Sequence, residues 1–123
     1  MNETLCLEAY DELYMIDLKQ LLYFQADDHY SKVYYANGTH YNVPFGLSKV
    51  QDFIDRKPDI SIFFIRLGRK YIVNVRRIFR ISTTKDLLYL SDDHGNNIPL
   101  HISKPVLRAL IDDYHNRLLT DEQ

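Results

Sequence analysis

The pattern of apolar and polar positions along the chain predicts a structure made mostly of short β-strands. Asn37-Gly38 lies between two such runs and favours a tight hairpin turn, because both residues tolerate positive φ. Residues 92–96 lie between the last two runs and predict a second hairpin. The runs rich in apolar, aromatic and β-branched residues, which are typical of strands, are residues 21–26, 30–36, 39–43, 60–66, 71–73, 77–81, 87–91 and 97–102.

Two segments show helical spacing instead. Leu47, Val50, Phe53 and Ile54 share one face of a helix predicted over residues 47–57, which Pro58 and Asp59 would end. A second helix is predicted over residues 104–118, with Ser103 as its N-cap and Pro105 near its first position. Its buried stripe would consist of Val106, Leu107, Leu110, Ile111, Tyr114 and Leu118. The predicted fold class is therefore mainly β with short helices.

Length and composition narrow the class of protein. A chain of 123 residues is the usual size of one domain with a single core. We expect an extension over residues 1–9, a domain over 10–118 and a tail over 119–123. An apolar fraction of 46% argues against disorder, and no apolar run is long enough to cross a bilayer. The acidic first twenty residues do not resemble a secretory signal, and a single Cys suggests a reducing compartment, so a cytoplasmic protein without a membrane partner is expected.

The average charge of the chain hides an uneven distribution. A pI near 6.2 argues at first against a nucleic-acid partner. Residues 1–59 carry a net charge of −5, residues 60–110 of +6 and residues 111–123 of −3. The basic side chains are densest in residues 66–80, RLGRKYIVNVRRIFR, which contain no acid. Such a cluster forms either a solvated basic face or a phosphate-binding surface, and composition alone does not decide between them.

No arrangement of residues indicates catalysis. Cys6 has no basic neighbour in sequence, and the five His residues are not spaced as metal ligands. Residues 92–97 lack the Glu and the length of a calcium loop, so a hairpin turn explains them better. No P-loop, nucleophile elbow or dinucleotide fingerprint is present. We therefore expect no enzyme activity, no catalytic or metal site, no cofactor and no small-molecule substrate.

Residues 64–75, FIRLGRKYIVNV, closely resemble the signature of LytTR domains, the DNA-binding module of bacterial LytR/AlgR-type response regulators. That signature reads roughly F-x-R-x-(H/G)-(R/K)-(S/K)-(Y/F)-(I/L)-V-N. Three further segments are similar to the family in order and spacing: residues 21–26 to an I-x-Y-I-E-A strand, 47–52 to an S-L-x-x-L-E helix and 98–104 to an I-P-V-S-R segment. The resemblance covers about residues 10–116.

The resemblance implies several small antiparallel sheets with a C-terminal helix, and loops rather than a recognition helix that enter successive major grooves of duplex DNA. It places one DNA-facing loop at residues 28–32, a second contact region at Arg69 and Lys70, and a third at Ser103 and Lys104. Lys104 stands where the family often has Arg, which puts base-specific contact there in doubt. The DNA-binding residues predicted in this way are His29, Tyr30, Lys32, Arg66, Arg69, Lys70, Arg76, His101, Ser103 and Lys104.

Some of these residues also have a structural interpretation. Arg66 follows a strand and is expected to be as much structural as DNA-binding. For Arg77, a solvated surface position explains the residue as well as a DNA contact does. The same two interpretations are equally good for His101. Asn74 is interpreted as fastening the backbone at a strand end rather than touching a base.

The function implied is that of a sequence-specific regulator of transcription that binds double-stranded promoter DNA. Half-site repeats are typical of the family, so a second copy is expected to bind beside the first. The alternative is a protein-interaction or inhibitory module on the same scaffold with weak DNA affinity, whose acidic N-terminal segment would suit a basic partner. No receiver domain precedes the module in this sequence. It is therefore either a stand-alone regulator, which Met1 favours, or an excised fragment.

Overall fold

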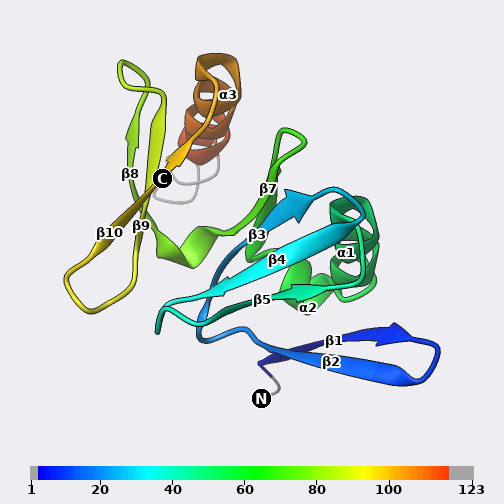
Figure 1. Cartoon of the computed structure of the whole chain (residues 1–123). Coiled ribbons are helices and arrows are strands. Elements are labelled where there is room, and N and C mark those ends of the chain that lie inside the picture. Colours follow the sequence, from blue (N-terminus) through cyan, green and yellow to red (C-terminus); the bar gives the residue numbers. More distant parts are fainter. Residues whose placement is uncertain (1–2, 117–123) are drawn as a thin grey trace. The chain divides into compact units, whose positions relative to one another are not determined.

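The computed structural model describes residues 3–116 and divides into two compact units, with the boundary in sequence between Arg77 and Ile78 (Figure 1). The first unit contains elements that the sequence analysis predicted and others that it did not. Its elements are β1 (Thr4–Ala9), β2 (Glu12–Asp17), β3 (Leu21–Asp27), β4 (Tyr30–Tyr35), β5 (His40–Val43), α1 (Leu47–Asp55), α2 (Pro58–Ser61), β6 (Phe64–Leu67), β7 (Tyr71–Asn74) and the 3₁₀ turn η1 (Val75–Arg77).

The first unit is built on a five-stranded antiparallel sheet of order β5-β4-β3-β7-β6. One face of the sheet carries Phe24, Val33 and Ile72, which lie opposite one another in the register and are fully buried. Helix α1 contacts β3, β4 and β7 and presents Leu47, Val50 and Ile54 to the same core. The apolar stripe predicted for this helix is confirmed, and Phe53 packs at its half-buried edge.

The β1–β2 hairpin is the main element that the sequence analysis did not predict. The two strands pair with each other from Thr4–Asp17 to Ala9–Glu12 and form a separate two-stranded sheet. Leu5 and Leu7 are fully buried in the core because β1 packs against α1. Most of the segment expected to be an extension, residues 1–9, is therefore part of the folded unit.

The strand predicted over residues 60–66 begins too early. Pro58 does not simply end the preceding helix, because it occupies the first turn of α2, where its fixed φ and missing N–H are tolerated. Ile60 is buried in the core from this helix, and the strand starts only at Phe64. The apolar run ISIFFI thus serves two elements, a case that a short apolar run does not resolve by periodicity.

The second unit combines a three-stranded antiparallel sheet of order β10-β9-β8 with a helix. Its elements are β8 (Ile78–Ser82), β9 (Leu87–Ser91), β10 (Asn97–His101) and α3 (Lys104–Tyr114). Leu88 and Leu90 of the sheet are fully buried, and so is Leu107 of α3, with Leu110 nearly so. Ser103 is the N-cap residue as predicted, but its side chain makes no capping hydrogen bond. Leu118, assigned to the buried stripe, lies outside the described residues.

The fold class is confirmed: the chain is mainly β, with several small antiparallel sheets and a helix that follows the last strand. Both predicted hairpins are present, β4–β5 at Gly38, whose φ is +91°, and β9–β10 at residues 92–96. The predicted boundary at residue 118 falls outside the described residues and stays a prediction. None of the helices between residues 3 and 116 is long and apolar enough to span a membrane.

Candidate nucleic-acid interface

Two turns that carry predicted DNA-binding residues lie at the same end of the five-stranded sheet. The register places Gln25, near the end of β3, opposite Tyr71 at the start of β7. The β3–β4 turn (residues 28–29) and the β6–β7 turn (residues 68–70) therefore project from the same sheet end. The backbone N–H of Ala26 donates to the Lys70 carbonyl at 2.8 Å and ties the second turn to β3.

The start of α1 lies at this end as well. The hydroxyl of Ser31, which is fully buried, donates to the Phe45 carbonyl at 2.8 Å and holds the chain just before the helix. A Cβ on Gly46 would lie 3.9 Å from the His29 carbonyl oxygen, so the two backbones are close neighbours. We call residues 28–29, 46–49 and 68–70 together the loop end.

The β3–β4 turn exposes polar groups on a fixed backbone. Asp28 adopts a φ of +58°, which the short polar side chain of Asp tolerates better than most residues do. His29 Nε2 lies 3.7 Å from the Asp28 carboxylate, and the two side chains are 91% and 80% exposed. Such an exposed pair is weak, so the imidazole remains accessible to a ligand. Tyr30 follows and is half-exposed.

The β6–β7 turn presents two cations and no acid. Gly68 has a φ of +66°, a left-handed conformation that a residue with a side chain adopts only with strain. Arg69 and Lys70 are both exposed, and the Lys70 ammonium lies 5.8 Å from the centre of the Tyr71 ring. Residues 68–70 thus form a turn between two paired strands and place both charges at its tip.

Arg66 contacts both the β6–β7 turn and α1. Its Nε donates to the Gly68 carbonyl at 3.2 Å, and its Nη1 donates to the Ser48 hydroxyl at 3.4 Å. Ser48 was not singled out from the sequence, because it lies 18 residues from Arg66 and no local pattern signals the contact.

Lys32 lies on the face of the sheet opposite the core. It is half-buried, is paired with Gln25 in the register and shares its face with Tyr23 and Tyr34. The rings of Tyr23 and Tyr34 are stacked with centroids 4.5 Å apart, and the Tyr71 ring meets Tyr23 edge-on at 5.7 Å. Burial is the main cause that raises the pKa of Tyr23 and of Tyr71 above the ordinary value, so both phenols resist ionisation more than exposed tyrosines do. The three rings pack together across β3, β4 and β7, the strands that lead to both turns.

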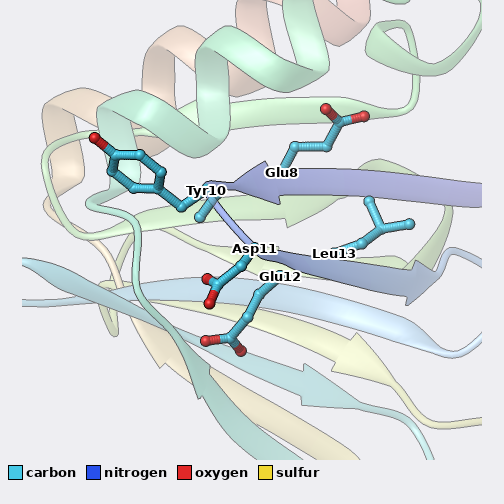
Figure 2. A pocket seen from close by; sticks show the side chains of 6 residues that line it. Glu8, Tyr10, Asp11, Glu12 and Leu13 are labelled. Carbon is cyan, nitrogen blue, oxygen red and sulfur yellow. The ribbon is translucent and has the colours of Figure 1, made fainter.

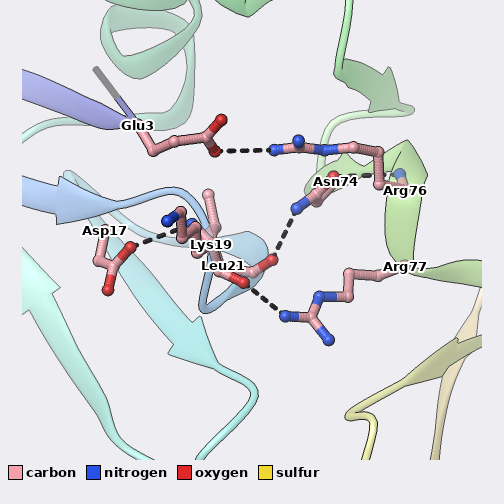
Figure 3. A network of polar contacts seen from close by, with 7 residues as sticks. All are labelled: Glu3, Asp17, Lys19, Leu21, Asn74, Arg76 and Arg77. Carbon is pink, nitrogen blue, oxygen red and sulfur yellow. Dashed lines mark hydrogen bonds and ion pairs between the residues drawn. The ribbon is translucent and has the colours of Figure 1, made fainter. Parts of the chain in front are cut away.

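Arg76 follows the other end of β7, away from the β6–β7 turn. It belongs to the network of polar contacts around Asn74 (Figure 3). Its guanidinium is 3.4 Å from the Glu3 carboxylate and 4.1 Å from the centre of the Phe63 ring. Arg77 donates to the Lys19 carbonyl nearby. The structure therefore does not bring Arg76 together with Arg69 and Lys70, although all three belong to one basic stretch of sequence.

Asn74 fastens the backbone, as the sequence analysis proposed. It is 1% exposed, its Nδ2 donates to the Leu21 carbonyl at 2.9 Å, and its Oδ1 accepts from the Arg76 N–H at 3.0 Å (Figure 3). The amide thus joins the end of β7 to the start of β3.

The three remaining predicted residues belong to the second unit. His101 ends β10, and Ser103 and Lys104 begin α3, all three with exposed side chains. The Ile102 N–H donates to the Asp86 carbonyl at 3.1 Å and holds this segment against the β8–β9 turn. The second unit thus presents one exposed cation and two polar side chains at the junction between β10 and α3.

The tip of the β1–β2 hairpin is acidic. It surrounds an open hollow of about 560 Å³ lined by residues 8–13, among them Glu8, Asp11 and Glu12 (Figure 2). The base of the hairpin is tied to the far end of the sheet by the Asp17 N–H, which donates to the Tyr35 hydroxyl at 3.2 Å. Tyr14, nearer the tip, packs edge-on against Phe45 with centroids 6.1 Å apart.

The exposed groups of the loop end suit a polyanion. Arginine grips phosphate or guanine with a planar fork, lysine binds phosphate as a point charge, and imidazole donates to a base edge or a phosphate. Within residues 3–116, no group of three or more His, Cys, Asp or Glu side chains is placed to hold a metal ion. Asp92 instead accepts hydrogen bonds from the His94 and Asn96 N–H groups at 2.8 and 3.0 Å, which supports a hairpin turn.

Comparisons with known proteins found one family model and solved structures that match the chain. The family model described as LytTr DNA-binding domain matches residues 11–112. Among solved structures, the chain is similar to the LytTr DNA-binding domain of a protein from Bacillus cereus described as a methyl-accepting/DNA response regulator. That match has a TM-score of 0.58 and 23% sequence identity, and it covers 91% of this chain and 96% of the other. No curated protein matches the chain.

Proposed function

Because the chain belongs to the LytTr DNA-binding domain family and is thus a DNA-binding regulator of transcription, we propose that it recognises a specific duplex sequence with loops. The observation that carries this proposal is the loop end. Two turns and the start of α1 meet at one end of a rigid sheet, and the β6–β7 turn presents Arg69 and Lys70 without a neighbouring acid in the turn. Loops held by a rigid scaffold are common binding elements.

The loop-end residues divide into base-reading and phosphate-binding roles. We assign Arg69 to a guanine, whose O6 and N7 accept the two parallel hydrogen bonds of a guanidinium in the major groove. His29 and Tyr30, exposed at the other turn, are assigned to a base edge or an adjacent phosphate. Lys70 and Lys32 are assigned to phosphates, where an ammonium releases counterions and makes the affinity depend on salt.

The second unit is assigned a contact of its own. Ser103 and Lys104 at the start of α3 are proposed to meet the backbone of a separate groove, with His101 beside them. A lysine at this position suits phosphate better than bidentate reading of guanine. DNA contact by Arg76 stays a prediction outside the loop end, because that side chain is engaged with Glu3 and Phe63. Promoter repeats with a second copy bound alongside complete the proposal.

Selection of bound sequences from a random duplex library tests the proposal directly and yields the operator. Fluorescence anisotropy with the selected duplex and a scrambled duplex, at 50–200 mM salt, then measures specificity. We expect the affinity for both duplexes to fall as salt rises, with a higher affinity for the selected one. Failure to enrich any sequence, or binding indifferent to salt, would contradict the proposal.

Arg69→Ala separates base reading from phosphate binding. If Arg69 reads guanine, the variant loses about 1–3 kcal/mol of binding free energy for the selected duplex and much less for the scrambled one. An equal loss on both duplexes would assign Arg69 to phosphate. Lys19→Ala is the matched control, because it removes one exposed positive charge at the opposite end of the sheet and should change neither affinity appreciably.

A further inference from the structure

We propose that Arg66 and Ser48 form a positioning pair that orients the β6–β7 turn for base reading and that neither side chain binds DNA. This inference rests on the proposed function of the loop end. Arg66 was expected to be both structural and DNA-binding, and this inference gives it the structural role alone. It also gives Ser48 a role that its sequence context does not suggest.

The first observation is that one guanidinium joins two elements. Arg66 lies in the middle of β6, opposite Ile72 of β7, and its side chain is half-buried. Nε donates forward to the Gly68 carbonyl at 3.2 Å, while Nη1 donates across to Ser48 in the first turn of α1 at 3.4 Å. Two donors of one planar group are thereby directed into the protein rather than toward a ligand.

The second observation is that the two carbonyls flanking Arg69 are both held. The Gly68 carbonyl accepts from Arg66, and the Lys70 carbonyl accepts from the Ala26 N–H at 2.8 Å. The Arg69 backbone is therefore anchored on each side, while its own side chain is exposed. Of these two hydrogen bonds, the one from Arg66 comes from a side chain. It holds the carbonyl of Gly68, the residue with the left-handed backbone conformation.

The third observation concerns α1. Its start is fixed to the sheet by the hydrogen bond from buried Ser31 to Phe45, and it lies beside the His29 backbone. Through the contact between Arg66 and Ser48, the β6–β7 turn is therefore fixed to the start of α1, which also lies beside the β3–β4 turn. Base reading requires side chains held within about 0.5 Å of the productive position, and such a shared support provides that accuracy.

Arginine is required for this role because its rigid fork holds two acceptors in different directions at once, whereas the single ammonium of lysine does not reproduce that geometry. Lysine does, however, bind phosphate well. The substitution Arg66→Lys therefore distinguishes positioning from direct contact while it preserves the charge.

The experiment measures the affinities of wild type, Arg66→Lys, Ser48→Ala and the double variant for the selected and scrambled duplexes, with the salt dependence of each. We expect Arg66→Lys to lower the affinity for the selected duplex about three- to tenfold, the value of one or two lost hydrogen bonds. Affinity for the scrambled duplex and the slope of log K against log salt should stay at wild-type values. Ser48→Ala should also lower the affinity for the selected duplex and leave that for the scrambled duplex unchanged. In the double variant the loss of affinity for the selected duplex should be smaller than the sum of the two single losses, because both substitutions break the same contact.

Several results would overturn the inference. Full discrimination by Arg66→Lys, or a changed salt slope, would mean that Arg66 contacts phosphate. Wild-type discrimination by Ser48→Ala, or additive effects in the double variant, would remove Ser48 from the pair. Ser48 is exposed and its replacement does not threaten folding, so this arm decides the matter if Arg66→Lys is unstable. Loss of selective binding by the wild type itself would instead refute the proposed function.

Discussion

Replacement of Asn74 by Ala should destabilise the first unit strongly, since the amide joins β7 to β3. The substitution removes a donor to the Leu21 carbonyl at 2.9 Å and an acceptor for the Arg76 N–H at 3.0 Å. Leu21 is fully buried, so its carbonyl finds no water to replace the lost partner. A buried polar group left without a hydrogen bond costs about 1–3 kcal/mol.

The two lost hydrogen bonds set the expected magnitude. The Leu21 carbonyl contributes the larger share, and the half-buried Arg76 N–H a smaller one. Together they predict a fall of about 2–4 kcal/mol in the free energy of unfolding, against about 5–15 kcal/mol for a typical domain. With a urea m-value of about 2 kcal/mol/M, the middle of the usual range, the midpoint of unfolding should fall by roughly 1–2 M.

Urea unfolding followed by circular dichroism, without DNA, measures this change. Asn42→Ala is the matched control, because Asn42 lies exposed on β5 of the same sheet and its loss should cost less than about 0.5 kcal/mol. A loss below about 1 kcal/mol for Asn74→Ala would refute the anchoring argument. Unchanged stability together with reduced affinity for DNA would indicate that Asn74 contacts a base.

The acidic hairpin tip and the β9–β10 turn give two further predictions. Replacing Asp11 with Asn and Glu12 with Gln should raise the affinity for any duplex about two- to fivefold at low salt, because it removes two exposed negative charges of the first unit that repel phosphate. The gain should fade as salt rises in anisotropy titrations, and a gain confined to one sequence would refute the electrostatic cause. Hydrogen bonds from the Asn96 side chain and from the His94 and Asn96 backbones lower the pKa of Asp92 below its ordinary value. Its stabilisation of the turn is therefore present above the ordinary pKa and is lost as the pH falls through the lowered one. NMR titration of the His94 and Asn96 amides should show this midpoint, and Asp92→Asn should abolish it.

Most strands were predictable because their signals are local. Asn37-Gly38 fixed one hairpin by its tolerance of positive φ, and the basic turn at residues 68–70 was recognisable from its Gly between two short strands. The stripe of α1 followed from helical spacing alone. Each of these elements is encoded by residues within one short segment of the chain, so no knowledge of the tertiary structure was needed.

The parts that sequence reasoning missed depend on distant partners. Leu5 and Leu7 alternate as in a strand, but their burial arises from α1, some forty residues later. The basic stretch of residues 66–80 appears as one patch in sequence, yet β7 separates Arg69, in the turn before it, from Arg76, just after it. The contact between Arg66 and Ser48 likewise depends on packing between a strand and a helix.

The three-residue turn between β6 and β7 has a consequence for how recognition can change in evolution. Leu67 and Tyr71 close the turn as a cross-strand pair and are both almost fully buried, so the strand register is set outside the turn. The side chains at positions 69 and 70 are exposed, while position 68 requires glycine for its backbone. Substitutions at these two surface positions therefore avoid the loss of stability that changes in a folded core impose, and under the proposed function they are the route by which the recognised sequence would change.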